Sequence, residues 1–136
     1  MAYDYSVEIA SLQRQITDMS NQRAEILQKI NTLQTGRKVI NKSLTTVKKN
    51  AQDLPRVKNQ ATENFIGTRR EHFNAKVDGL TTAVNSWVSK TNGNLTTIDQ
   101  KISSLKAAAA NLNIGMSYAN KSLSEYYYLQ SVSKDK

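Results

Sequence analysis

The feature that most constrains this chain is a heptad pattern in its first half. From Ile9 to Leu54, apolar positions recur with spacings that alternate between three and four residues without a slip. This pattern is typical of a coiled-coil seam, because it places the residues on one stripe of an α-helix. Only Arg23 and Arg37 interrupt the stripe, and Gly36 leaves the register intact. The pattern therefore predicts one long helix.

A second stripe with spacings of three and four residues runs from Phe73 to Tyr126. Its one irregular step, from Trp87 through Thr91 to Leu95, is a stutter in the heptad pattern. The stutter coincides with the breaker-rich residues 92–94, so we expect either a loosened turn or a break in the helix near Asn92–Asn94.

Two features should separate the stripes. Pro55 lacks a backbone donor and restricts Leu54, so the first helix should stop or bend near Asp53, which can cap the next helical segment. Further on, Gly67 can adopt the positive φ of a helix end, and Thr68 can cap the next helix. The chain is therefore expected to reverse at residues 65–68.

These elements predict an all-α fold, an elongated antiparallel helical hairpin of coiled-coil type that forms a single domain over residues 1–136. The first arm would span residues 5–66, the turn 65–68 and the second arm 68–129, with a frayed tail at 130–136. The chain has five Gly and one Pro, too few for the many turns of a sheet fold.

The apolar residues outside the two seams are more numerous than a two-helix contact can cover. A lone pair of helices buries only one narrow stripe of each helix, so the remaining apolar side chains need another surface. We therefore expect further helices from a partner. The residues concerned are Leu27, Val39, Val57, Val88 and Ile114.

Catalytic chemistry finds little support. The chain has no Cys and one histidine, His72, which stands next to Glu71 and is most simply a surface residue. No glycine-rich phosphate-binding motif occurs. We expect a protein that is not an enzyme and that has no catalytic, cofactor-binding or metal site.

Positive charge is concentrated in residues 37–70, which hold nine Lys and Arg against Asp53 and Glu63, so this segment carries +7 of the total net charge of +8. Such a field suits an acidic protein, an anionic surface or nucleic acid. Apart from Phe65, the segment lacks interleaved aromatic residues, and it has no contiguous basic run. An acidic protein partner is therefore expected in preference to nucleic acid.

Several residues are candidates for a partner interface. Arg23 and Arg37 can either lay their stems along the seam or meet a partner's carboxylates. The run Tyr126, Tyr127 and Tyr128 can pack helix ends or form a recognition surface. Trp87 can lie in the core at the stutter or anchor a partner.

The residues around the expected turn suggest a family. Phe65 and Gly67, followed by Phe73 six residues later, resemble the Trp-x-Gly turn of the WXG superfamily, with Phe in place of Trp. With this motif near its middle and Pro55 shortly before it, the chain is most similar to the YwqH-like helical proteins found beside LXG toxins in Gram-positive type VII secretion systems.

The resemblance implies an adaptor that binds the helical N-terminal domain of an LXG toxin and supports its stability or its targeting for export. The C-terminal Tyr-x-x-x-Asp/Glu export signal of secreted members is absent, so the toxin complex or a second small helical protein would supply it. The alternative is a self-assembling structural coiled coil, such as a phage or cytoskeletal rod component.

The start of the chain lacks the basic and apolar regions of a signal peptide, and no stretch approaches about 18 apolar residues. We therefore expect no membrane span and a cytoplasmic protein, which the resemblance allows to leave the cell with its cargo.

Overall fold

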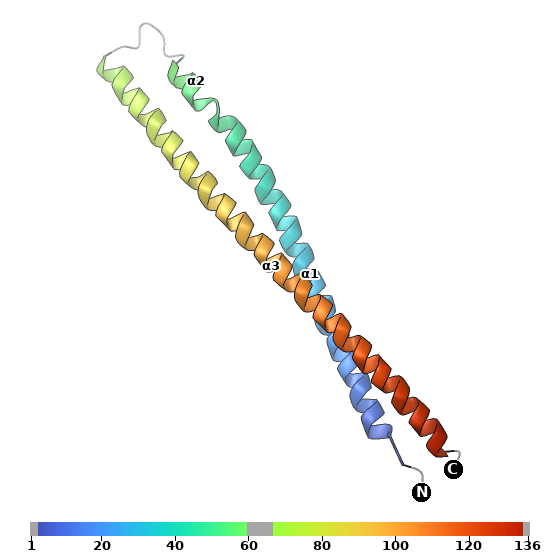
Figure 1. The fold of residues 1–136 in the computed structure, drawn as a ribbon. Helices are drawn as coiled ribbons and strands as arrows, with labels where there is room; N and C mark the ends of the chain where they lie inside the picture. Colours follow the sequence, from blue (N-terminus) through green and yellow to red (C-terminus); the bar gives the residue numbers. More distant parts are fainter. Residues whose placement is uncertain (1–2, 60–66, 135–136) are drawn as a thin grey trace. The chain divides into compact units, whose positions relative to one another are not determined.

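The protein is α-helical throughout the elements that the structure describes. The computed structural model describes residues 3–59 and 67–134, in which the helices are α1 (Ser6–Ala51), α2 (Leu54–Asn59) and α3 (Thr68–Lys134). These two stretches contain no strand. The predicted all-α class is therefore confirmed (Figure 1).

The helices form two compact units. Unit 1 consists of Met1–Leu33 and Lys101–Lys136, and unit 2 of Gln34–Gln100. In unit 1 the first part of α1 runs antiparallel to the last part of α3, and in unit 2 the rest of α1, with α2, runs antiparallel to the first part of α3 (Figure 1). Each unit thus has the hairpin-like pairing that the two stripes predict. The prediction of one domain over 1–136 stays a prediction.

The seam residues form the core of both units. Ile30, Ile102, Ala109 and Ala119 are the buried apolar residues of unit 1, and Leu44, Val77 and Leu95 are those of unit 2. All seven occupy positions of the two heptad stripes. No side chain in the described part of the chain is fully buried, as expected where two helices share a single contact stripe.

The first helix ends where Pro55 predicts. The backbone N–H of Asp53 bonds to the carbonyl of Asn50 at 3.1 Å, a turn that leaves the α-helical ladder. The carbonyl of Asp53 then accepts the N–H of Val57 at 2.9 Å, which makes Asp53 the N-cap residue of α2. Pro55 falls in the first turn of α2, where a missing N–H costs no helical hydrogen bond.

Of the two alternatives that the sequence allowed near Asn92–Asn94, the break in the helix does not occur. Helix α3 continues through these residues, and Thr91 and Leu95 on either side of them are both buried. A four-residue step keeps both side chains on one face of a helix, so the seam contact holds the segment helical despite the cost of Gly93.

Residues 130–134 are helical, whereas the sequence predicted a frayed tail at 130–136; residues 135 and 136 lie outside the described residues. Helix α3 extends to Lys134. The side-chain oxygen of Gln130 accepts the backbone N–H of Tyr5 at 2.7 Å, and the Ser133 hydroxyl donates to the carbonyl of Tyr3 at 3.3 Å. Contacts with the segment before α1 therefore stabilise the last turns of α3.

The expected turn is described only in part. Gly67 has a φ of 72°, the positive value expected from the sequence, and its carbonyl accepts the N–H of Glu71 at 3.1 Å. Gly67 is therefore the N-cap residue of α3, one position before the predicted cap at Thr68. Phe65 lies outside the described residues.

Candidate partner-binding surface

The three consecutive tyrosines of α3 have different environments. The ring of Tyr5 lies 5.6 Å from Tyr126 and 4.5 Å from Tyr3, so Tyr126 packs helix ends together. The hydroxyl of Tyr127 accepts a hydrogen bond of 2.7 Å from the Gln13 side chain. Tyr128 is 68% exposed. Tyr127, at 48%, is also exposed, so Tyr126 packs helix ends while its two neighbours face solvent. A recognition role for this run stays a prediction.

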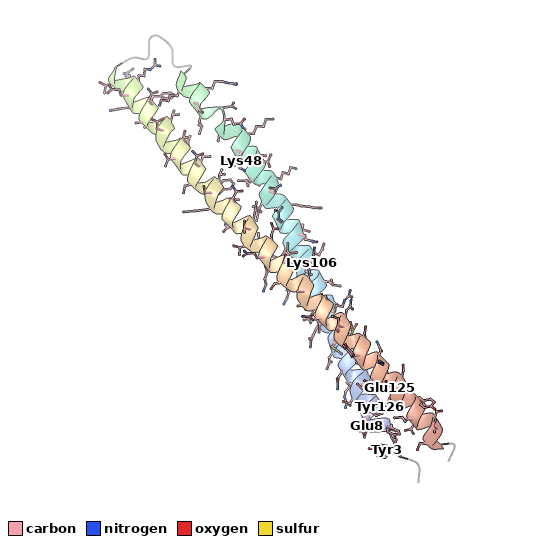
Figure 2. The ribbon with its side chains drawn as sticks, viewed as in Figure 1. Tyr3, Glu8, Lys48, Lys106, Glu125 and Tyr126 are labelled. Carbon is pink, nitrogen blue, oxygen red and sulfur yellow. The ribbon has the colours of Figure 1, made fainter. Side chains whose placement is uncertain are left out.

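Tyr3 lies near Tyr126, at the end of unit 1 where α1 begins and α3 ends (Figure 2). Its hydroxyl donates to Oε1 of Glu8 at 3.2 Å. This hydrogen bond, together with the negative charge of Glu8, raises the pKa of Tyr3 above its usual value. Tyr3 and Tyr5, which the sequence reasoning did not single out, thus complete the aromatic cluster around Tyr126.

Arg23 lies in unit 1 and is half-buried at its seam position. Its Nε is buried and has no hydrogen-bond partner within the described ranges. The stem therefore follows the seam, as one interpretation expects, and part of the guanidinium is withdrawn from water.

Arg37 meets a carboxylate of its own chain. Its Nε donates to Oδ1 of Asp99 at 2.5 Å and a terminal nitrogen donates to Oδ2 at 3.1 Å. These hydrogen bonds lower the pKa of Asp99 and raise that of Arg37. Asp99 thus takes the place that the sequence reasoning gave to a partner's carboxylate.

Three basic residues of unit 2 have acidic neighbours. Besides Arg37, the Lys58 ammonium donates to both oxygens of Asp78, at 3.0 and 3.3 Å, and Arg56 stands 3.9 Å from Asp53. The other basic residues of this unit form no ion pair with any described residue. They are Lys38, Lys42, Lys48, Lys49, Arg69, Arg70, Lys76 and Lys90.

Unit 2 therefore carries most of the positive charge. It contains eleven Lys and Arg against five Asp and Glu, a net charge of +6 out of +8. Lys48 of α1, labelled in Figure 2, forms no ion pair with a described residue. Such a concentration of positive charge produces a field that attracts negatively charged groups in general.

Both units expose large apolar side chains. In unit 2, Val39 is 63%, Leu80 52% and Trp87 42% exposed, whereas Phe73 is half-buried. Trp87 is therefore accessible to a partner. In unit 1, Ile114 and Leu27 are exposed, as the width of the apolar stripes predicts. Val88, placed with them in the sequence prediction, is half-buried.

Shallow hollows accompany these side chains. One of about 530 Å³ in unit 1 lies between α1 and α3. Its lining residues are Glu25, Gln28, Lys29, Thr32, Leu33, Lys101 and Leu105. A smaller one of about 220 Å³ lies between the helices of unit 2. Within residues 3–59 and 67–134, no group of acidic, His or Cys side chains could hold a metal ion in either hollow.

The described residues thus form an all-α protein of paired helices that has a thin core and exposed apolar side chains. The chain belongs to the YwqH-like family, whose model matches residues 7–127. No curated protein and no solved structure matches the chain. In the part of the chain that is described, no helix has the length and apolar character needed to cross a bilayer.

Proposed function

We propose that this protein is a non-enzymatic helical adaptor. It binds the helical N-terminal domain of an LXG toxin and supports the toxin's stability or its targeting to type VII secretion. Membership of the YwqH-like family supports the proposal, because the resemblance of the Phe65, Gly67 and Phe73 motif associates such proteins with these toxins.

The observation that carries the proposal is the incomplete burial of apolar side chains, both within the two stripes and beside them. Seven apolar residues are buried in the described part of the chain, whereas Val39, Leu80, Trp87 and Ile114 are each at least 42% exposed. Helices of a partner would cover these side chains and complete a bundle. Unit 2, with a net charge of +6, would favour an acidic face and speed the encounter.

The proposal assigns export signalling to the complex. The adaptor would hold the toxin's helices, and either the toxin or a second small helical protein would present the signal. In this proposal the adaptor catalyses no reaction. It acts on the toxin by binding the toxin's folded helices, which raises their free energy of unfolding.

Coexpression tests the proposal. The tagged protein is produced with the helical N-terminal domain of the LXG protein encoded beside its gene, and the two are expected to copurify. At a partner concentration of about 100 Kd, binding of the partner adds about 2.7 kcal/mol to the free energy of unfolding of this chain. For a chain of this length we expect a rise in Tm of about 5–10 °C.

A matched control uses an unrelated helical domain of similar size, which should leave the Tm unchanged. The proposal is contradicted if the protein does not copurify with the LXG domain and its Tm does not change when that domain is added. A homo-oligomer whose mass rises with concentration would instead favour the self-assembling rod, the alternative that the heptads alone allow.

A further inference from the structure

Helix α3 carries an exposed stripe in unit 2 that includes two seam residues, Leu80 and Trp87, and extends to the side of the seam. Lys76, Leu80, Ala83, Trp87 and Lys90 follow one another at spacings of four, three, four and three residues, so they share one face of the helix. All five are exposed. The stripe is therefore apolar in its middle and basic at both ends.

Helix α1 provides an uncharged stripe on the same side. Val39, Ser43, Thr46 and Asn50 follow at spacings of four, three and four residues and are exposed. The hollow of about 220 Å³ joins the two stripes, because Asn50 and Leu80 both line it. Its other lining residues are Val47, Ala51, Leu54 and Val84. We call these two stripes and the hollow the Trp87 face.

The acidic residues of α3 in unit 2 that form ion pairs lie outside the Trp87 face, on the other side of the helix from its lysines. Asp78 is two residues from Lys76, and Asp99 is nine residues from Lys90. At about 100° per residue, each lies about 160–180° around the helix from that lysine. Asp78 and Asp99 are also engaged, with Lys58 and Arg37.

The lysines of the Trp87 face therefore keep their charge available. Neither stripe contains a carboxylate, and Lys76 and Lys90 form no ion pair with a described residue. Hydrophobic contact at the centre and uncompensated positive charge at both ends specify a complementary ligand.

We propose that the Trp87 face binds an acidic amphipathic helix of a partner protein. Apolar side chains of that helix cover Leu80 and Trp87 and enter the hollow, and carboxylates near its two ends meet Lys76 and Lys90. These lysines are fourteen residues apart on α3, which corresponds to roughly 21 Å at the helical rise. The inference rests on the proposed function, since it locates the surface that receives the partner and states the partner's chemistry.

A second copy of the chain, packed with its own Trp87 face against this one, does not suit this surface. Unit 2 carries +6, and two Trp87 faces would bring lysines together with no carboxylate between them. Like charges in contact are unfavourable and slow association. The charge pattern therefore selects an acidic occupant.

Trp87 gives a direct readout, because it is the only tryptophan in the chain. The probe is a synthetic helical peptide of about 20 residues without tryptophan, with a leucine stripe and glutamates about 14 residues apart. Titration of this peptide into the full chain should shift the Trp87 emission to shorter wavelength and saturate. The same peptide with lysine in place of glutamate should cause no shift.

Charge reversal on the protein locates the contact. Lys76→Glu with Lys90→Glu should weaken binding of the acidic peptide at least about tenfold. The matched control is Lys38→Glu with Lys49→Glu, which changes the net charge equally at α1 positions outside both stripes. The control should stay within about twofold of the unmodified protein at physiological salt. Circular dichroism verifies that both variants are helical.

Three results would overturn the inference. The first is that the acidic peptide leaves the emission of Trp87 unchanged, and the second is that both charge reversals weaken peptide binding equally. The third is that a duplex DNA probe binds where the peptide does not, and that Lys76→Glu with Lys90→Glu abolishes DNA binding, which would identify a nucleic-acid surface.

The LXG domain separates this inference from the proposed function. If the domain binds the unmodified chain and the Lys76→Glu, Lys90→Glu variant equally well, the adaptor function stands and the Trp87 face is wrong. If the acidic peptide shifts the Trp87 emission in the expected pattern but the LXG domain does not bind, the face is supported and the proposed function fails.

Discussion

At the residue scale, Gly67 has the most specific backbone requirement. Its φ of 72° lies in the left-handed region, which a side chain with a Cβ disfavours by about 1–2 kcal/mol. An added Cβ would meet nothing within 4 Å. The constraint at this position is therefore conformational.

We predict that Gly67→Ala lowers the free energy of unfolding by about 1 kcal/mol. Gly36→Ala is the matched control, because Gly36 lies inside α1 and its added Cβ also meets nothing within 4 Å. The control should raise stability by about 0.5–1 kcal/mol. Urea unfolding followed by circular dichroism measures both, and a stabilising Gly67→Ala would contradict the assigned backbone conformation.

The Arg37 and Asp99 pair supplies a pH dependence. Hydrogen bonds from Arg37 lower the pKa of Asp99 in the folded protein. A carboxyl whose folded pKa is depressed adds stability above its unfolded pKa, and this contribution disappears as the pH falls through the folded pKa. Both side chains are more than a third exposed, so the effect should be small and sensitive to salt.

We predict that Asp99→Asn destabilises the protein slightly at pH 7 and that the difference from the unmodified protein vanishes in strong acid. Urea unfolding of both proteins across this pH range checks the prediction. Asp18→Asn serves as the control, because Asp18 forms no ion pair with another described residue. An Asp99→Asn difference that is constant with pH would show that the pair does not contribute through ionisation.

At the scale of the helices, the heptad stripes predicted most of the fold. Ile30, Leu44, Val77 and Ile102 are buried where the stripes place them, because antiparallel helices bury the stripes that face each other. The stop near Asp53 followed from the chemistry of Pro55. Periodicity and proline are local signals, so a single sequence carries them.

The absence of a helix break at Asn92–Asn94 has a physical cause. Asn and Gly favour turns when judged locally, but burial of Thr91 and Leu95 outweighs this preference. Thr96 and Thr97 also donate their hydroxyls to the carbonyls of Asn92 and Gly93, at 3.2 and 3.1 Å. Tertiary contact decided the conformation, and composition could not reveal it.

The continuous helix predicts that Gly93→Ala is stabilising. An added Cβ at Gly93 meets nothing within 4 Å, so the substitution should gain about 0.5–1 kcal/mol in unfolding free energy. Gly115→Ala should gain less, because its Cβ would lie 2.9 Å from the sulfur of Met19. Thermal unfolding of the two variants tests this order, and a destabilising Gly93→Ala would indicate a turn at this position.

At the scale of the whole molecule, the sequence indicated that the surface is basic and partly apolar, but it did not indicate which residues form ion pairs. Net charge and apolar excess predicted a partner, which stays a prediction, and Trp87, Val39 and Ile114 are exposed. The pairing of Arg37 with Asp99 and of Lys58 with Asp78 needed the register of the antiparallel helices, which heptads alone leave undetermined.

The same register decides which seam residues stay uncovered. Leu80 belongs to the second stripe, yet it is 52% exposed while Val77 is buried. Two helices cover only the centre of each stripe, and the position of that centre depends on how the helices rotate toward each other. The sequence could therefore predict that apolar surface stays exposed, but not where on the helices it lies.

The central claim is that the helical pairs are completed by helices of another protein. Light scattering during size-exclusion chromatography tests it most directly, with the chain alone and with an equimolar amount of the helical N-terminal domain of the neighbouring LXG protein. The account predicts a monomer of 15.2 kDa alone and, in the mixture, a single complex that contains both chains. Two separate peaks in the mixture, or a stable homo-oligomer that does not respond to the LXG domain, would contradict it.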